Sequence, residues 1–417
     1  MTAPAHVIIV SYYFPPLGLA GTARPVMLAN LLAGRGHRVV VVTVKPINYP
    51  IYDDSLLARL DGRVAVQRVE SLDPARLSRY LPMIPKSWLA RWKSRAAGAS
   101  KLFPDSKTGF VPFAVRAVEQ AMPFPANTVV ITTSPPVSSH LVGLYVRRSA
   151  PIKWIADFRD IWTSLPAESD SIETGRRAAE LTREIAGLAD AVTSTSPETR
   201  QFLLSLLLGE KKPVQFVPNG YDERDFTDAI TRQTLSLGLY GTLNHLIGFD
   251  RLARFVAQLR RSTDSDWRIR HVGHVDLPEL PSILAAHRLE NAFESTGYAP
   301  HPRSLALIRR SAVNLIALSD QYDTRYIVPS KLFELLRAEP PLLAMLPRNN
   351  AARHFLAERE FPRVAFADGS GQFVEAIEDF VAAEAKDPEP PPRPGVEQFE
   401  WQRTLAPFAD LVEGLLA

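Results

Sequence analysis

Short runs of β-branched residues alternate with longer helix-compatible segments along this chain, and the pattern occurs twice. The first series has candidate strands near 6–11, 38–44, 64–69, 128–132, 153–157, 190–195 and 214–217. The second has them near 235–240, 267–272, 292–296, 313–317, 341–345 and 363–366. Such alternation is typical of parallel sheets covered by helices. The sequence therefore predicts an α/β protein with two doubly wound, Rossmann-like domains in tandem, whose functional loops face a shared cleft.

The ends of the two series predict the domain boundaries. The first series ends at VPNGYDERDF, and the second ends at the proline-rich connector KDPEPPPRPG. We expect one domain over 1–230 and a second over 231–395. Beyond the connector, apolar residues at helical spacing predict a helix within 396–417, which Pro407 should bend or split. The apolar residues are Trp401, Leu405, Phe408, Val412 and Leu415.

Composition excludes several classes of protein. The 417 residues include no cysteine, so neither a disulfide framework nor a thiolate metal site is available. We find no signal peptide and no run of 18 apolar residues, and we expect a cytoplasmic protein without a membrane span. A net charge of +3 and the lack of a recognisable motif argue against nucleic-acid binding.

The first strand leads into the loop SYYFPPLGLAGTARP. Gly18, Ala20 and Gly21 lie where this strand turns toward its helix, and small residues there let a ligand approach backbone N–H groups and a helix N-terminus. The spacing is neither the GxGxxG fingerprint nor a GxxxxGK[ST] phosphate loop. A purely structural turn is the alternative interpretation.

Several segments in order resemble bacterial family-four glycosyltransferases, in particular those that build cell-surface polysaccharides. The segments are SYYFPPLGLAGTARP, TSPPVSSH, IADFRDIWT, VPNGYD, LYGTL and IVPSKLFELL. The resemblance implies the GT-B fold, with the acceptor bound mainly by the first domain and a nucleotide sugar by the second. It also implies a last helix that crosses back to the first domain, and an enzyme that needs neither metal nor cofactor.

The IVPSKLFELL segment is the predicted donor site. Ser330 is placed to cap a helix, Lys331 adds a cation, and Glu334 lies one turn further on the same face. By resemblance, Lys331 contacts the phosphates and Glu334 the ribose hydroxyls, while Gly241 and Thr242 lie in the donor loop after LYGTL. A solvated Lys331–Glu334 pair is the alternative.

Three positions depart from the family pattern. Tyr326 stands where a glutamate is common, and Thr242 and Ile247 stand where the family often has an arginine and a lysine. Arg325 offers one replacement charge for a phosphate. These departures put activity itself in doubt.

On the acceptor side, IADFRDIWT places Asp157, Arg159 and Asp160 at the end of the fifth strand. Two carboxylates beside an arginine can orient an acceptor hydroxyl or create a proton acceptor, and they can equally form a structural ion-pair cluster. For a retaining enzyme, the family implies that the leaving phosphate itself can accept the proton.

Two further patterns concern metal binding and membrane contact. The histidines of HVGH at 271–274 have no partner cluster, so we expect no metal site. The basic, tryptophan-containing segment 76–101 suits contact with an anionic membrane surface, with an insertion packed on its own domain as the equal alternative.

The sequence thus predicts a glycosyltransferase that moves a sugar from a nucleoside diphosphate sugar to a saccharide or lipid-linked acceptor in surface or exopolysaccharide assembly. A nucleotide-sugar epimerase and a catalytically silent GT-B partner protein are the alternatives. We expect peripheral association with the inner face of the plasma membrane as an option, through 76–101.

Overall fold

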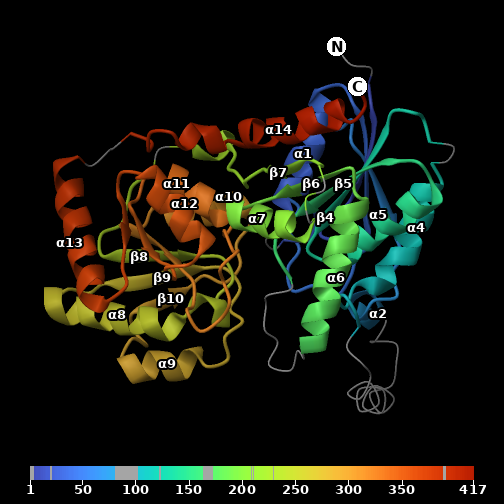
Figure 1. The fold of residues 1–417 in the computed structure, drawn as a ribbon. Coiled ribbons are helices and arrows are strands. Elements are labelled where there is room, and N and C mark those ends of the chain that lie inside the picture. The colour runs from blue at the N-terminus through green and yellow to red at the C-terminus, as the bar shows by residue number, and fades with distance from the viewer. Residues whose placement is uncertain are drawn as a thin grey trace. The chain divides into compact units, whose positions relative to one another are not determined.

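The computed structural model describes two compact units. The described residues are 4–18, 21–79, 102–121, 124–162, 172–207, 209, 211–228, 230–387 and 391–417. Unit 1 holds the described residues up to Pro218 together with Leu405–Ala417, and unit 2 holds Asn219–Thr404. Figure 1 shows both units as ribbons, and each is considered by itself.

Within the described residues, unit 1 is built on a seven-stranded parallel sheet with the order β3-β2-β1-β4-β5-β6-β7. In β1, Ile8 lies opposite Val40 of β2 and Val130 of β4, so the central strand is buried between its neighbours. The strands are β1 (His6–Val10), β2 (Arg38–Val44), β3 (Ala65–Val69), β4 (Thr128–Ser134), β5 (Lys153–Phe158), β6 (Ala191–Ser194) and β7 (Val214–Phe216). The first predicted series of strands is confirmed.

The helices of unit 1 connect these strands. Two of them start as their sequences indicate, because Ser196 and Asp73 each accept a hydrogen bond from an N–H of the first turn and a proline follows directly. The helices are α1 (Ala23–Gly34), α2 (Pro74–Leu77), α4 (Val111–Glu119), α5 (Ser138–Ser149), α6 (Ile172–Leu188) and α7 (Pro197–Leu206). Short 3-10 turns cover η1 (Leu57–Arg59) and η3 (Thr108–Phe110).

Unit 2 repeats the architecture with a six-stranded parallel sheet, again counted over its described residues, in the order β10-β9-β8-β11-β12-β13. The strands are β8 (Ser236–Tyr240), β9 (Arg268–Val272), β10 (Phe293–Ser295), β11 (Val313–Ala317), β12 (Leu342–Met345) and β13 (Val364–Phe366). The second predicted series is confirmed as well. In both sheets the strand order reverses, between β1 and β4 and between β8 and β11, and ligands of doubly wound folds bind at the carboxyl edge beside such a reversal.

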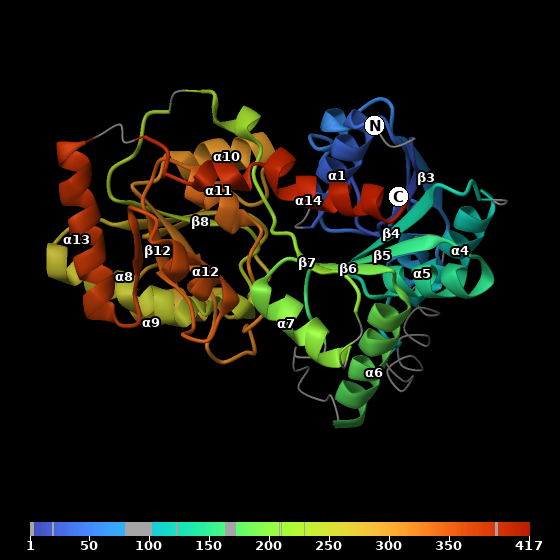
Figure 2. The ribbon, with the colours of Figure 1, turned by 45° about the horizontal axis from the view of Figure 1, so that its top comes forward.

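Helices cover both faces of the unit 2 sheet (Figure 2). One core packs α8 (Phe249–Thr263), α9 (Leu280–His287) and α13 (Ser370–Lys386) against the strands. The other packs α10 (His301–Arg309), α11 (Lys331–Arg337) and α12 (Ala351–Arg359) on the opposite face. The 3-10 turns η4 (Glu223–Phe226), η5 (His245–Ile247) and η6 (Val396–Phe399) complete the unit. Burial on both faces explains the nearly continuous apolar strands.

The chain ends in α14 (Trp401–Gly414), which runs past Pro407 without a break, so the predicted split does not occur. The part from Leu405 onward belongs to unit 1, where it lies beside α1 in both views (Figures 1 and 2). Arg35, directly after α1, pairs with Asp410 at 2.5 Å and with Glu413 at 3.2 Å.

No helix among the described residues has the length and apolar character that crossing a membrane would require. Residues 80–101, which form most of the basic segment 76–101, lie outside the described residues.

Candidate functional site

The carboxyl edge of the unit 1 sheet holds a buried ion pair between Asp157 at the end of β5 and Arg24 in the first turn of α1. Arg24 Nη2 lies 2.9 Å from Asp157 Oδ1, and the two side chains are 2% and 1% exposed. Thr133 and Thr193 donate further hydrogen bonds to the same carboxylate, at 2.8 and 2.6 Å. Since β5 lies between β4 and β6 in the sheet, Asp157 has partners on both neighbouring strands and on α1.

These contacts decide the protonation of Asp157. Burial by itself would raise the pKa of this carboxyl, but the Arg24 charge and the hydrogen bonds outweigh burial and lower the pKa to about 2. The carboxylate is therefore ionised and fully engaged within unit 1. Asp157 thus pairs with Arg24 rather than with Arg159, whereas Asp160 is exposed, and an acceptor role for either carboxylate stays a prediction.

Arg159 is buried and holds two loops together through their backbone carbonyls. Its guanidinium donates to Ser134 at 2.7 Å, to Pro135 at 3.0 Å and to Gly21. A Cβ at Gly21, whose φ is +95°, would lie 2.9 Å from Nη1 of Arg159. The small residue predicted for ligand approach thus makes room for a guanidinium of the protein itself.

Gly18 and Ala20 are the other two small residues predicted in this loop. The Gly18 N–H donates to the Ile51 carbonyl at 3.1 Å, so this amide is already paired. Ala20 lies outside the described residues. Whether the loop receives an acceptor or a phosphate stays a prediction.

In unit 2, the end of β8 is held by Lys331 and His271. Lys331 Nζ donates to the Tyr240 carbonyl, and His271 Nε2 lies 2.8 Å from the Gly241 carbonyl oxygen. Burial lowers the pKa of His271 to about 4, so its ring is neutral. It donates from Nε2 and accepts from the Ser295 hydroxyl at Nδ1, 2.9 Å away.

Lys331 is the predicted donor-site cation, and the structure brings it against Gly241. A Cβ at Gly241, whose φ is +100°, would lie 3.3 Å from Nζ. Burial lowers the pKa of Lys331 to about 8. Among the described residues, no carboxylate lies within ion-pair distance of its Nζ, so the cation is desolvated but not neutralised.

The predicted cap of α11 does not form. Ser330 has αR backbone torsions and makes no cap hydrogen bond. An N-cap residue accepts with its side chain from an extended backbone conformation, which the turn after Pro329 does not allow here. Our assignment of Ser330 as a capping residue is therefore wrong.

Glu334 is not paired with Lys331. Its Oε1 lies 2.7 Å from Nε2 of His301, the first residue of α10. The solvated Lys331–Glu334 pair considered from the sequence is thus absent from the contacts of the described residues.

The predicted replacement cation, Arg325, lies apart from Lys331 in this set of contacts. It forms a bidentate pair with Asp323 at 2.8 and 2.7 Å, and it lines a cavity of about 390 Å³ with Arg251 and Arg348. Ile247 is 7% exposed within the core of unit 2, so it contributes no polar group, and Thr242 is half-buried. Whether Arg325 replaces one of the missing phosphate cations stays a prediction.

Sequence reasoning missed Arg24, His271 and His301. His271 was considered only as a metal ligand, and the described residues contain no group of three or more carboxylate or histidine side chains suited to a metal ion. An arginine in the first turn of a helix was the one available signal for Arg24, because a cation there is unfavourable without an anionic partner.

A family model and several solved structures match this chain. Residues 20–220 match the family model described as glycosyl transferase 4-like domain. No curated protein matches the chain.

Solved structures resemble the chain over nearly its full length. Sucrose-phosphate synthase from Thermosynechococcus elongatus has a TM-score of 0.63 at 16% identity, covering 99% of this chain and 94% of that one. The N-terminal domain of Candida albicans trehalose-6-phosphate phosphatase gives 0.66 at 13%, covering 99% and 97%. Anabaena HepE in complex with UDP-glucose gives 0.60 at 13%, covering 99% and 98%. At such identities the likeness establishes the fold, which is GT-B.

Replacing Asp157 with Asn should destabilise unit 1 strongly. The change leaves the Arg24 guanidinium buried without an anion, and breaking a buried pair in this way costs about 3–5 kcal/mol. Urea unfolding measures the loss. Asp410→Asn, which removes the exposed partner of Arg35, is the control and should change stability little. Equal losses in the two variants would contradict the buried-pair interpretation.

Lys331 should leave a signature in the pH dependence of stability. Its folded pKa of about 8 lies below the ordinary value of 10.5, so between these pH values the unfolded chain holds a proton that the folded chain has lost. The free energy of unfolding therefore gains a contribution that rises with pH across this window. The stability of the wild type relative to Lys331→Met should therefore be lowest below pH 8 and should rise between pH 8 and pH 10.5. Melting temperatures of both proteins across this range measure it; a constant offset would contradict the lowered pKa.

Proposed function

Starting from a chain that carries a glycosyl transferase 4-like domain on a GT-B fold, we propose that it is a glycosyltransferase using a nucleoside diphosphate sugar. The observation that carries the proposal is Lys331, a half-buried ammonium at the carboxyl edge of the unit 2 sheet without a carboxylate partner among the described residues. A pyrophosphate would supply the missing anion.

The surroundings of Lys331 support this role. The carbonyls of Tyr240 and Gly241 are held by Lys331 and His271, which keeps the β8–α8 loop in place beside the cation. Negative charge develops on the leaving diphosphate during sugar transfer, and a fixed positive charge there stabilises the transition state. HepE, whose fold is similar, is described in complex with UDP-glucose, which makes UDP the first nucleotide to try.

The finer features stay part of the proposal. We propose a saccharide or lipid-linked acceptor bound by unit 1, retention of the anomeric configuration, a role in surface polysaccharide assembly, and no need for a metal. The engagement of Asp157 by Arg24 fits a reaction in which the leaving phosphate, rather than a strong protein base, accepts the proton. Peripheral membrane contact through 76–101 is proposed from the sequence alone.

UDP should raise the melting temperature of the wild type, because a ligand held only by the folded state stabilises it by mass action, about 2.7 kcal/mol at a hundredfold excess over Kd. Lys331→Met should weaken binding about 10- to 100-fold, the usual range for hydrogen bonds to a charged group. Lys212→Met is the matched control, since Lys212 also donates to backbone carbonyls, those of Ala186 and Ala189, but in unit 1. Its variant should bind UDP as the wild type does.

Product analysis with UDP-sugars separates the proposal from its alternatives. A glycosyltransferase releases UDP, slowly to water or faster to an acceptor, and loses this activity with Lys331→Met. An epimerase would change the sugar without releasing UDP. A silent partner protein would do neither, and the absence of binding to UDP, GDP and dTDP alike would overturn the proposal.

A further inference from the structure

His301 lies between two carboxylates from different parts of unit 2. Its Nε2 is 2.7 Å from Glu334 Oε1 on α11, and its Nδ1 is 3.7 Å from Asp225 Oδ2 in η4. The side chains are 18%, 17% and 5% exposed for His301, Glu334 and Asp225. The imidazole therefore contacts one of the two oxygens of Glu334 at hydrogen-bond distance, and its other nitrogen faces the Asp225 carboxylate at a longer distance.

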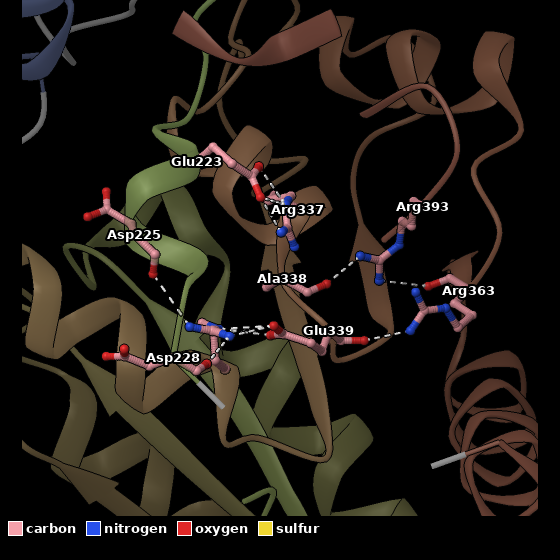
Figure 3. A network of polar contacts seen from close by, with 9 residues as sticks. Glu223, Asp225, Asp228, Arg337, Ala338, Glu339, Arg363 and Arg393 are labelled. Atoms are coloured by element: carbon pink, nitrogen blue, oxygen red, sulfur yellow. Dashed lines mark hydrogen bonds and ion pairs between the residues drawn. The ribbon is translucent and has the colours of Figure 1, made fainter. Parts of the chain in front are cut away.

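The network in Figure 3 fixes the segment that carries Asp225. Arg309, at the end of α10, donates to the Asp225 carbonyl at 3.4 Å and to the Asp228 carbonyl at 2.8 Å. The same guanidinium makes a bidentate contact with Glu339, at 2.9 and 2.6 Å. Since His301 begins α10 and Arg309 ends it, the same helix lies beside the Asp225 side chain at one end and donates to the backbone around Asp225 at the other.

The carboxyl end of α11 is fixed as well. Arg337 forms a bidentate pair with Glu223 of η4, with its Nε 2.9 Å from Glu223 Oε2. Arg393, from the proline-rich connector, is 1% exposed and donates to the Leu336 carbonyl at 2.7 Å. It also donates to the Ala338 carbonyl at 2.7 Å (Figure 3). A cation at a helix C-terminus interacts favourably with the helix dipole. With the helix backbone held, only the side-chain torsions of Glu334 are left to be set, and His301 sets them.

We propose that His301 is a positioning residue that orients the Glu334 carboxylate toward the ribose hydroxyls of a bound nucleoside diphosphate. The proposal rests on the proposed function, because it needs a nucleotide beside Lys331, three residues before Glu334. A carboxylate accepts hydrogen bonds at both oxygens. With Oε1 engaged by the imidazole, Oε2 is the oxygen presented to a hydroxyl donor. His301 thus acts through Glu334 and does not touch the reacting atoms.

The experiment compares UDP with 2′,3′-dideoxy-UDP, which lacks the ribose hydroxyls, in wild type and His301→Leu. The wild type should bind UDP at least about tenfold more tightly than the dideoxy compound, as a hydrogen bond to a charged acceptor allows. His301→Leu should lose most of this ratio by weakening UDP alone. In transfer assays the variant should raise KM for the donor with little change in kcat, because the ribose contact exists in ground and transition state alike.

Further variants serve as controls for this interpretation. His301→Gln keeps an N–H donor near the position of Nε2 and should restore much of the ratio. His287→Leu removes another histidine of unit 2 that contacts a carboxylate, Asp250 at 3.0 Å, and should leave the ratio unchanged. Glu334→Gln should lose the ratio by itself, and adding His301→Leu to it should change nothing more.

The outcomes are distinguishable. An undiminished ratio in folded His301→Leu, or equal weakening of UDP and its dideoxy analogue, overturns the role of His301 and leaves the proposed function standing. If the wild type binds UDP only weakly, the same pair is measured with guanosine in place of uridine. Failure of the wild type to bind any of these nucleotides overturns the proposed function and this inference together.

Discussion

At the carboxyl edges of both sheets, cationic side chains donate hydrogen bonds to backbone carbonyls and so hold the loops in place. Arg159 joins the loops of Gly21 and Ser134 in unit 1, and Lys331 does the same for the end of β8 in unit 2. Carbonyl dipoles reduce the cost of burying a cation but do not cancel its charge, unlike a carboxylate. A loop fixed in this way is rigid and at the same time attractive to an anion, and the proposed binding of a diphosphate sugar depends on that combination.

The two units use buried charge differently. In unit 1 the Asp157 carboxylate is fully engaged by Arg24 and by the hydroxyls of Thr133 and Thr193, so Asp157 is not available as a base. In unit 2, no carboxylate among the described residues pairs with Lys331. Burial therefore lowers the pKa of Lys331, because no nearby anion stabilises its charged form. This asymmetry fits a protein whose unit 1 shapes an acceptor surface and whose unit 2 grips an anionic donor, as we propose.

The site could be predicted from the sequence only in part. Lys331 and Glu334 were identified because they lie in the first turn of a predicted helix, and a family resemblance attached roles to them. Their partners were not identified: His301 is 33 positions from Glu334, and Tyr240 is 91 positions from Lys331. Ser330 failed as a cap because its αR torsions, set by the preceding proline turn, matter more than its residue type. The basic stretch 80–101 lies outside the described residues and stays a prediction.

By itself, the sequence determined where the strands lie along the chain and that they are parallel, because alternation of β-branched runs with helical segments is a local pattern that burial on both faces of a sheet imposes. It also predicted two α/β domains in tandem, although unit 2 continues past the proline connector to Thr404. Only the tertiary structure decided which polar side chains become hydrogen-bond and ion-pair partners. Asp157 finds Thr133 and Thr193 because β5 lies between β4 and β6. Pairings of this kind depend on which strands become neighbours, and no local sequence pattern carries that information.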